Sequence, residues 1–253
     1  MPVNIYETNR RLHEYLLFHY GTLRDIFSIV RGPKGALGFH ARCMDFLIEN
    51  ISKKGRGRAL DLGCGVGRAA FELSQHFQEV VAIDYSHAFI QAADQLKKNG
   101  RVRFPMVEQG EITKEIAVRP PEKSHRERII FRQGDASRLP KSLGAFDVVV
   151  LMNLIDRLKY PRRCLNDLPR LVKGGGYVLM TSPYSWQTEF TSREKWLGGF
   201  RKKGKAIRPL AVIKDLLGEH FELLKLTDIP FVIREHERKF EWAVPQVSLW
   251  RKK

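Results

Sequence analysis

One short segment of the sequence has the residue types and spacing of a ligand-binding turn. It reads Asp61-Leu-Gly-Cys-Gly-Val-Gly67 and follows a short apolar run. Glycines let a backbone approach a ligand closely, and the amides that begin a following helix point toward that ligand. The segment therefore predicts a binding site for a small charged molecule. A glycine turn with a purely structural role is the alternative.

Two cofactors compete for this segment. A dinucleotide site needs Gly-x-Gly-x-x-Gly, but Gly65 is followed by Arg68 where the third glycine should stand. Asp61 would also place a negative charge near a pyrophosphate. S-adenosylmethionine has no phosphate, and an acid at the end of a strand can face its ammonium group. We therefore predict S-adenosylmethionine as the cofactor, held here by Asp61, Gly63, Cys64, Gly65 and Gly67.

Polar residues follow three further apolar runs. Asp84, next to Tyr85, can accept hydrogen bonds from two ribose hydroxyls. Asp135 would bind the adenine amino group while Ala136 offers its amide to a ring nitrogen, and Asn153 would lie beneath the methyl group. NAD enzymes also place an acid at the position of Asp84, and the other residues suit turns or strand ends. These residues support the cofactor only together with the glycine segment.

The elements that position these residues follow from hydrophobic periodicity. Continuous apolar runs suit strands covered on both faces, and they alternate with helical patterns. This predicts an α/β fold with a Rossmann-like, seven-stranded, mostly parallel sheet. A short connection before the final strand predicts that this strand is antiparallel. Strands are expected near 59–62, 80–83, 128–132, 146–152, 177–181, 221–226 and 246–250, and helices near 9–23, 39–51, 162–172 and 211–217, after Gly67 and after Ser86.

We expect a single domain over residues 1–253. Residues 1–55 would form a helical cap, and 56–253 a core with an insertion near 101–126, read as a hairpin. Residues 52–57 read as a basic, flexible linker and 182–208 as a loop. Residues 173–176 read as a turn, and Pro169 should disturb its helix.

Charge is the unusual feature of the composition. Lys plus Arg is 44 and Asp plus Glu is 28, a formal net charge of +16 in 253 residues. Such a surplus suits nucleic acid, membrane surfaces or acidic substrates as partners. Much of it lies in the linker, the insertion and residues 201–208, which we expect outside the cofactor cleft. Three widely spaced cysteines, no long apolar run and no signal-peptide pattern predict a reduced, cytoplasmic protein without a metal site.

These motifs now resemble a known family. The glycine segment, Asp84, Gly134-Asp135-Ala136 and the run that ends in Asn153 resemble class I S-adenosylmethionine-dependent methyltransferases over residues 55–182. Over nearly the whole chain, the sequence is similar to the C-terminal methyltransferase domain of ovothiol biosynthesis proteins. That closer similarity rests on the segments YETNRRLHEYLLFHYG (6–21), TSPYSWQTEFTSREKWLGG (181–199) and PFVIREHERKFEW (230–242).

The resemblance implies methylation of an imidazole nitrogen of 4-mercaptohistidine, giving ovothiol A. A histidine-derived thiol is then the small-molecule substrate. The related proteins carry an iron-dependent sulfoxide synthase domain, which this sequence lacks, so a separate synthase is the second implied partner. The chain is either a stand-alone methyltransferase or that domain from a longer protein.

Substrate residues are expected in the segments that carry the resemblance. Methyl transfer is an in-line displacement that needs alignment rather than a strong base. Asn153 and Tyr184 are the candidate catalytic residues, and the candidate substrate-binding residues are Tyr6, Tyr15, His19, Arg157, Trp186 and Lys195. Arg193, Trp196, Arg234 and His236 are weaker candidates. Core packing of the cap and solvated loops are the alternatives for all of them.

Two other functions remain open at this point. The basic cluster at 201–208 would let an RNA or protein methyltransferase contact phosphates, although no Asn-Pro-Pro-Tyr type motif follows Asn153, and nucleic acid is not the expected partner. A non-catalytic S-adenosylmethionine-binding module is the other alternative. The intact set of Asp61, the glycine segment and Asp84 argues against it.

Overall fold

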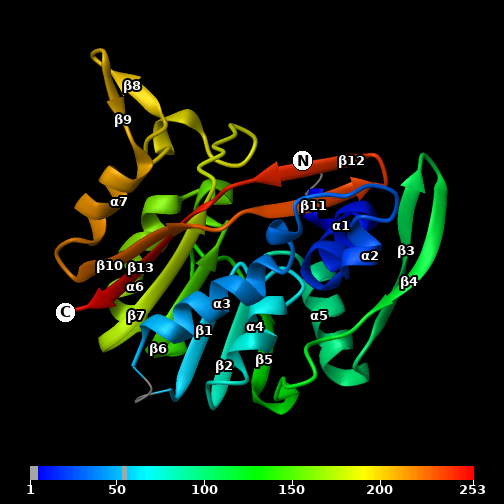
Figure 1. Cartoon of the computed structure of the whole chain (residues 1–253). Helices are drawn as coiled ribbons and strands as arrows, with labels where there is room; N and C mark the ends of the chain where they lie inside the picture. Colours follow the sequence, from blue (N-terminus) through cyan, green and yellow to red (C-terminus); the bar gives the residue numbers. More distant parts are fainter. Residues whose placement is uncertain (1–4, 53–55) are drawn as a thin grey trace.

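The computed structural model describes residues 5–52 and 56–253, and its centre is a seven-stranded sheet of order β10-β13-β7-β6-β1-β2-β5 (Figure 1). The strands are β1 (Arg58–Leu62), β2 (Glu79–Asp84), β5 (Ile129–Gln133), β6 (Phe146–Met152), β7 (Val172–Ser182), β10 (Phe221–Asp228) and β13 (Gln246–Lys252). Strand β13 runs opposite to the other six strands of the sheet, which all point the same way. The predicted sheet, including its antiparallel last strand, is confirmed.

Helices cover both faces of this sheet because its strands are apolar on both sides. Along β6, Val148 and Val150 pack in one core, whereas Val149 and Leu151 pack in the other. The first core includes residues of α3 (Phe39–Asn50), α4 (Arg68–Leu73) and α5 (His87–Asn99), and the second includes α6 (Pro161–Leu171) and α7 (Pro209–Leu217). Ser86 caps α5, as expected, by accepting the Phe89 N–H.

The N-terminal cap contains η1 (Ile5–Glu7), α1 (Asn9–Tyr20), α2 (Leu23–Ile26) and η2 (Lys34–Ala36). Thr8 is the N-cap of α1, in line with the sequence. The helix expected over 9–23 is confirmed over 9–20 but ends there, because Gly21 is extended and Thr22 caps α2 with a capping box. Part of the expected linker, residues 53–55, lies outside the described residues.

Three hairpins project from the core. β3 (Val102–Gln109) and β4 (Ile112–Val118) form the hairpin expected in the insertion. The expected plain loop at 182–208 is wrong: it contains η6 (Arg193–Lys195) and the hairpin of β8 (Phe200–Lys202) and β9 (Lys205–Ile207). The last two sheet strands are separated by another hairpin, β11 (Phe231–His236) and β12 (Lys239–Ala243), rather than by a loop. Helix α1 packs against β3 and β11 (Figure 1).

Three local features complete the fold. Residues 173–176 are not a turn but belong to β7, where the pairing skips from Phe146–Val172 to Val148–Tyr177 and leaves a bulge. Pro169 disturbs α6 less than expected, because the helix ends two residues later and Lys252 Nζ donates to the Pro169 carbonyl. Short 3-10 turns occur at Arg126–Arg128, Lys141–Leu143 and Ile155–Arg157. Among the described residues, no helix combines the length and the apolarity needed to cross a membrane.

Candidate functional site

The turn between β1 and α4 has a backbone that favours glycine. Gly63, Gly65 and Gly67 have φ angles of 71°, 54° and 88°, in the left-handed region where a side chain is strained. The Gly65 N–H donates to Asp84 Oδ2 at 2.8 Å, which fixes the turn to the end of β2. Cys64 is buried within the turn, and burial raises the pKa of its thiol well above the ordinary value. It stays a neutral packing residue.

Asp61 is a buried acid with one unpartnered oxygen atom. It is 1% exposed, and its Oδ2 atom has no hydrogen-bond partner among the described residues. Burial, and secondarily the nearby Asp84, raises the pKa of Asp61 to about 7. Leaving such a group unpaired is costly, so the site is built to receive a cation or a hydrogen-bond donor.

Residues 6 and 7 of the cap lie across the start of α5. The Ser86 hydroxyl donates to the Tyr6 carbonyl at 2.9 Å, and Glu7 Oε1 accepts the His87 N–H at 2.9 Å. Asp84 Oδ1 accepts the Ser86 N–H, so this carboxylate, the glycine turn and the cap are joined. The neighbouring Tyr85 is 62% exposed.

Helix α1 rests on the glycine turn. A Cβ atom at Gly65 would lie 3.1 Å from the His19 ring, and His19 Nδ1 accepts the Arg68 N–H at 3.4 Å. The His19 ring also lies 3.8 Å from the His40 ring, measured between centroids. Burial lowers the pKa of His19 well below its ordinary value and that of His40 to about 3. Both histidines are therefore neutral and support the turn.

Aromatic rings connect the cap to the segment after β7. Tyr6 lies 6.0 Å from Tyr15 and 5.9 Å from Phe190, between ring centroids. Arg157 lies over the same Phe190 ring at 5.2 Å. Tyr15 also packs on Phe89 of α5 at 4.8 Å. The structure thus brings three of the predicted substrate residues, Tyr6, Tyr15 and Arg157, together around Phe190, which the sequence reasoning missed.

Hydrogen bonds between Asn153, after β6, and Thr181 of β7 connect the ends of these two strands. The backbone of Asn153 has a φ of 50°, and the Thr181 hydroxyl donates to its side-chain oxygen at 2.9 Å. This fixes the amide at the carboxyl edge of the sheet. Asp135 and Ala136 follow β5 at the same edge; Asp135 Oδ1 accepts the Ser137 N–H, and Ala136 is buried.

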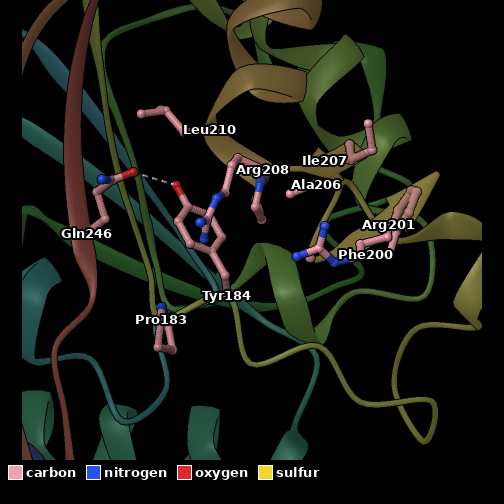
Figure 2. Close-up of a pocket in the computed structure, with 11 residues that line it drawn as sticks. Pro183, Tyr184, Phe200, Arg201, Ala206, Ile207, Arg208, Leu210 and Gln246 are labelled. Atoms are coloured by element: carbon pink, nitrogen blue, oxygen red, sulfur yellow. Dashed lines mark hydrogen bonds between the residues drawn. The ribbon is translucent and has the colours of Figure 1, made fainter. Parts of the chain in front are cut away.

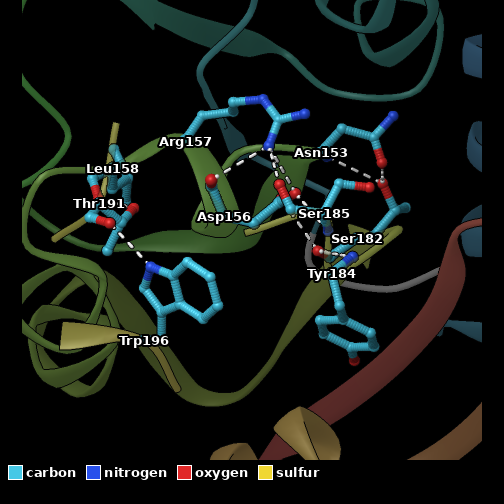
Figure 3. A network of polar contacts seen from close by, with 10 residues as sticks. Asn153, Asp156, Arg157, Leu158, Ser182, Tyr184, Ser185, Thr191 and Trp196 are labelled. Atoms are coloured by element: carbon cyan, nitrogen blue, oxygen red, sulfur yellow. Dashed lines mark hydrogen bonds and ion pairs between the residues drawn. The ribbon is translucent and has the colours of Figure 1, made fainter. Parts of the chain in front are cut away.

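Asp156 is a second residue that the sequence reasoning did not single out. It is 1% exposed and accepts hydrogen bonds from the Ser182 hydroxyl and the Ser185 N–H (Figure 3). Its carboxylate also pairs with Arg157 Nη1 at 2.9 Å, and that nitrogen donates to the Ser185 carbonyl as well. Arg157 is therefore held by the protein itself, which reduces its capacity to hold a substrate carboxylate.

Tyr184 points away from this network. Figure 3 shows its ring directed away from Asn153 and Asp156, and its hydroxyl donates to Gln246 Oε1 at 3.1 Å. The ring lines a cavity of about 720 Å³ (Figure 2). Tyr184 therefore faces a binding space rather than the amide of Asn153. The other lining residues are Pro183, Gly199, Phe200, Arg201, Ala206, Ile207, Arg208, Pro209, Leu210 and Gln246.

Part of the basic segment 201–208 lines this cavity. Arg201 and Arg208 belong to the wall of the cavity beside Tyr184. Spacing does not predict this, because it depends on how the base of the β8–β9 hairpin lies beside Tyr184 and Gln246. No short-range sequence pattern marks that arrangement.

The remaining predicted residues lie elsewhere. Trp186 is buried against Trp196, whose ring centroid is 6.2 Å away, and so belongs to the core of its own segment. Lys195 lies over the Tyr160 ring at 4.5 Å. Arg193 lies over Trp196. Buried Arg234 donates to the Asp25 carbonyl, and His236 accepts the Arg238 N–H. None of these contacts joins them to Asn153 or Tyr184.

Comparison with known proteins finds sequence similarity to methyltransferases. Residues 60–180 match the family described as "Methyltransferase domain". The ubiquinone/menaquinone biosynthesis C-methyltransferase of Geobacter sp. is 28% identical over 152 residues, covering 57% of this chain and 53% of that protein. An uncharacterized methyltransferase of Bacillus subtilis is 20% identical over 142 residues, covering 56% and 47%. The chain thus spans about half the length of these relatives.

Solved structures share the fold over most of the chain. The N-methyltransferase NodS of Bradyrhizobium japonicum, in complex with S-adenosylhomocysteine, has a TM-score of 0.53 and 15% identity, covering 95% of this chain and 98% of that one. The magnesium protoporphyrin IX methyltransferase of Synechocystis, also with bound S-adenosylhomocysteine, has a TM-score of 0.56 and 15% identity, covering 98% and 97%. Residues 60–180 are thus similar to a methyltransferase domain, and the sheet has the Rossmann-like fold of these solved methyltransferases.

Proposed function

We propose that this chain binds S-adenosylmethionine along the carboxyl ends of β1, β2, β5 and β6. The unpartnered Oδ2 atom of Asp61 fits the ammonium group of the methionine moiety. Asp84 and the exposed ring of Tyr85 suit the ribose, and Asp135 with the Ala136 amide suits adenine. Asn153 holds the edge nearest to the methyl group.

We further propose that the acceptor is an imidazole nitrogen of 4-mercaptohistidine. The observation that carries this proposal is the assembly of the three segments that resemble the ovothiol methyltransferase domain. Tyr6 of the first meets Phe190 of the second at 5.9 Å, and Phe18 of the first meets Phe231 of the third at 5.2 Å. Segments far apart in sequence thus pack on one another through the first of them, which supports a shared role.

The chemistry asks little of the protein beyond alignment and exclusion of water. S-adenosylmethionine supplies an electrophilic methyl group. A neutral imidazole nitrogen forms the new N–C bond while the S–C bond breaks, and the resulting imidazolium loses its other N–H proton to solvent. The neutral rings of half-buried Tyr6 and Tyr15 and of buried His19 provide a largely apolar wall, since burial raises the pKa of both tyrosines and lowers that of the histidine.

The test is an acceptor comparison. The purified chain is incubated with methyl-labelled S-adenosylmethionine and one acceptor at a time. The three acceptors are histidine, 4-mercaptohistidine and histidylcysteine sulfoxide. We expect label in 4-mercaptohistidine at the highest kcat/KM. If none of the three compounds is methylated, the acceptor proposal is overturned. RNA labelling with a steep salt dependence would favour the RNA methyltransferase, and tight cofactor binding without transfer would favour a binding module.

A further inference from the structure

The cavity beside Tyr184 lies at the same edge of the sheet as the methyl-transfer site. In the register of the sheet, Met152 pairs with Thr181, and Ser182 pairs with Gln246. Asn153 follows Met152 directly, and Gln246 lines the cavity. Gln246 therefore lies at the same edge of the sheet as Asn153, two strands away.

The charge of the cavity wall is one-sided. Among its eleven lining residues are two arginines, Arg201 and Arg208, and no aspartate or glutamate. Arg201 Nη1 donates to the Gly204 carbonyl at 2.8 Å, which steadies its guanidinium on the hairpin. Within residues 5–52 and 56–253, neither arginine forms an ion pair, and Arg208 has no side-chain hydrogen bond. Both guanidinium groups retain donors for an anion, which arginine binds in a bidentate manner.

The other walls suit a small planar ring rather than a polymer. Phe200, Ile207 and Leu210 are apolar, and the Tyr184 ring stands between Pro183 and Gln246 (Figure 2). Burial raises the pKa of Tyr184 to about 12, so its hydroxyl stays neutral and bound to Gln246. Tyr184 also has a φ of 54°, a strained conformation of the kind that collects at binding sites. The volume of about 720 Å³ falls in the range of small-molecule sites.

Arg157, the sequence-based candidate for the substrate carboxylate, lies outside the cavity lining. Its Nη1 atom is shared between Asp156 and the Ser185 carbonyl. We propose instead that the Tyr184 cavity is the acceptor subsite, in which Arg208, assisted by Arg201, binds the carboxylate of an amino-acid-like acceptor. This inference deepens the proposed function and rests on it for the identity of the acceptor.

The test combines one variant with one modified substrate. Arg208→Gln is compared with Lys202→Gln, which removes the same charge from the same hairpin outside the cavity lining. We expect Arg208→Gln to raise the acceptor KM by about tenfold or more, the usual scale for a lost charge-assisted hydrogen bond, with little change in kcat. Lys202→Gln should leave KM unchanged, and calorimetry should give the same S-adenosylmethionine affinity in all three proteins.

The methyl ester of 4-mercaptohistidine removes the carboxylate charge. The wild type should lose affinity for the ester by a similar factor, whereas Arg208→Gln should bind acid and ester alike. Methylation of 4-mercaptohistidine with equal KM values in wild type and Arg208→Gln would overturn the cavity inference and leave the proposed function intact.

If 4-mercaptohistidine is not methylated, the proposed function fails, and binding decides on the cavity. Calorimetry of 4-mercaptohistidine with the S-adenosylhomocysteine-loaded protein then supports the carboxylate site if binding depends on Arg208. Binding that is absent or equal in both proteins overturns it.

Discussion

His19 Nδ1 accepts the backbone N–H of Arg68 at 3.4 Å, so a residue of the cap holds the first residue of α4. The Tyr20 hydroxyl adds a second link, donating to the Val66 carbonyl at 2.8 Å. Both links end on the turn that follows β1. The cofactor-binding edge is therefore shaped from two directions, by the sheet beneath it and by α1 above it.

Asp84→Asn should weaken S-adenosylmethionine binding by about tenfold or more, because a neutral amide accepts weaker hydrogen bonds than a carboxylate. The substitution also places a side-chain NH2 group, which is a donor, near the Gly65 N–H, which donates to Asp84 Oδ2 in the wild type. Isothermal titration calorimetry measures the affinity. Asp215→Asn, an exposed change of the same type on α7, is the control. Equal affinities in the two variants would remove Asp84 from the ribose assignment.

Cofactor binding should depend on pH through Asp61. Burial raises its pKa to about 7, so the free protein holds a proton there that an incoming ammonium must displace. Affinity should rise as the pH rises toward 7 and then level off, with proton release at pH 6. Calorimetry in two buffers of different ionisation enthalpy measures that release. Asp61→Asn should bind more weakly and lose this component; a pH profile identical to wild type would contradict the assignment.

The same group affects folding. A carboxyl whose pKa is raised in the folded state contributes stability that is present below about pH 4 and is lost as the pH rises toward 7. Cofactor-free wild type should therefore lose stability over this window relative to Asp61→Asn. Urea denaturation at pH 5 and pH 7.5 measures the difference between the two proteins, and a constant difference would exclude this role.

His40 should act in the opposite sense. Burial lowers its pKa to about 3, so its contribution is present above its ordinary pKa of about 6.5 and is lost as the pH falls below that value. His40→Leu should therefore show a smaller fall in melting temperature between pH 6.5 and 4.5 than wild type. His220→Gln, at an exposed histidine, should follow the wild-type curve. Parallel curves for His40→Leu and wild type would count against the buried, neutral His40.

The glycine turn offers a matched test of packing. Gly67 has a φ of 88°, and a Cβ atom there would lie 2.7 Å from the Phe131 ring. Gly67→Ala should destabilise the fold by about 1–3 kcal/mol through strain and overpacking. Gly35 has ordinary backbone geometry and open space around it, so Gly35→Ala should be neutral or slightly stabilising. Chemical denaturation of both variants checks the contrast.

Much of the fold could be predicted because its signals are local. Apolar runs such as residues 80–83 and 146–152 became central strands, and Ser86 caps its helix as its type and position suggest. The glycine turn and Asp84 were also found, since acids and glycines at strand ends are close in sequence to the strands that place them. Their contact, from Gly65 to Asp84, follows from the parallel pairing of β1 and β2.

The rest depends on contacts between distant segments. Nothing in the sequence around Phe190 indicates that it contacts both Tyr6 and Arg157. Asp156 looks like an ordinary loop acid until Ser182 and Ser185 enclose it. Basic residues at 201–208 suggest a solvated surface, and only the position of the hairpin base beside Tyr184 brings Arg208 to the cavity wall. Hydrophobic periodicity predicts elements but not which loops meet.

The packing of the cap on β11 sets the order in which the protein can be completed during synthesis. Arg234 reaches back 209 residues to the Asp25 carbonyl, and Phe231 packs on Phe18 of α1. Contacts across such distances form late, because long stretches of chain must be closed first. A ribosome that has made the glycine turn has not yet made the strand that secures α1 above it. A nascent chain lacking β11 therefore has the glycine turn and α1 without the strand that packs on α1.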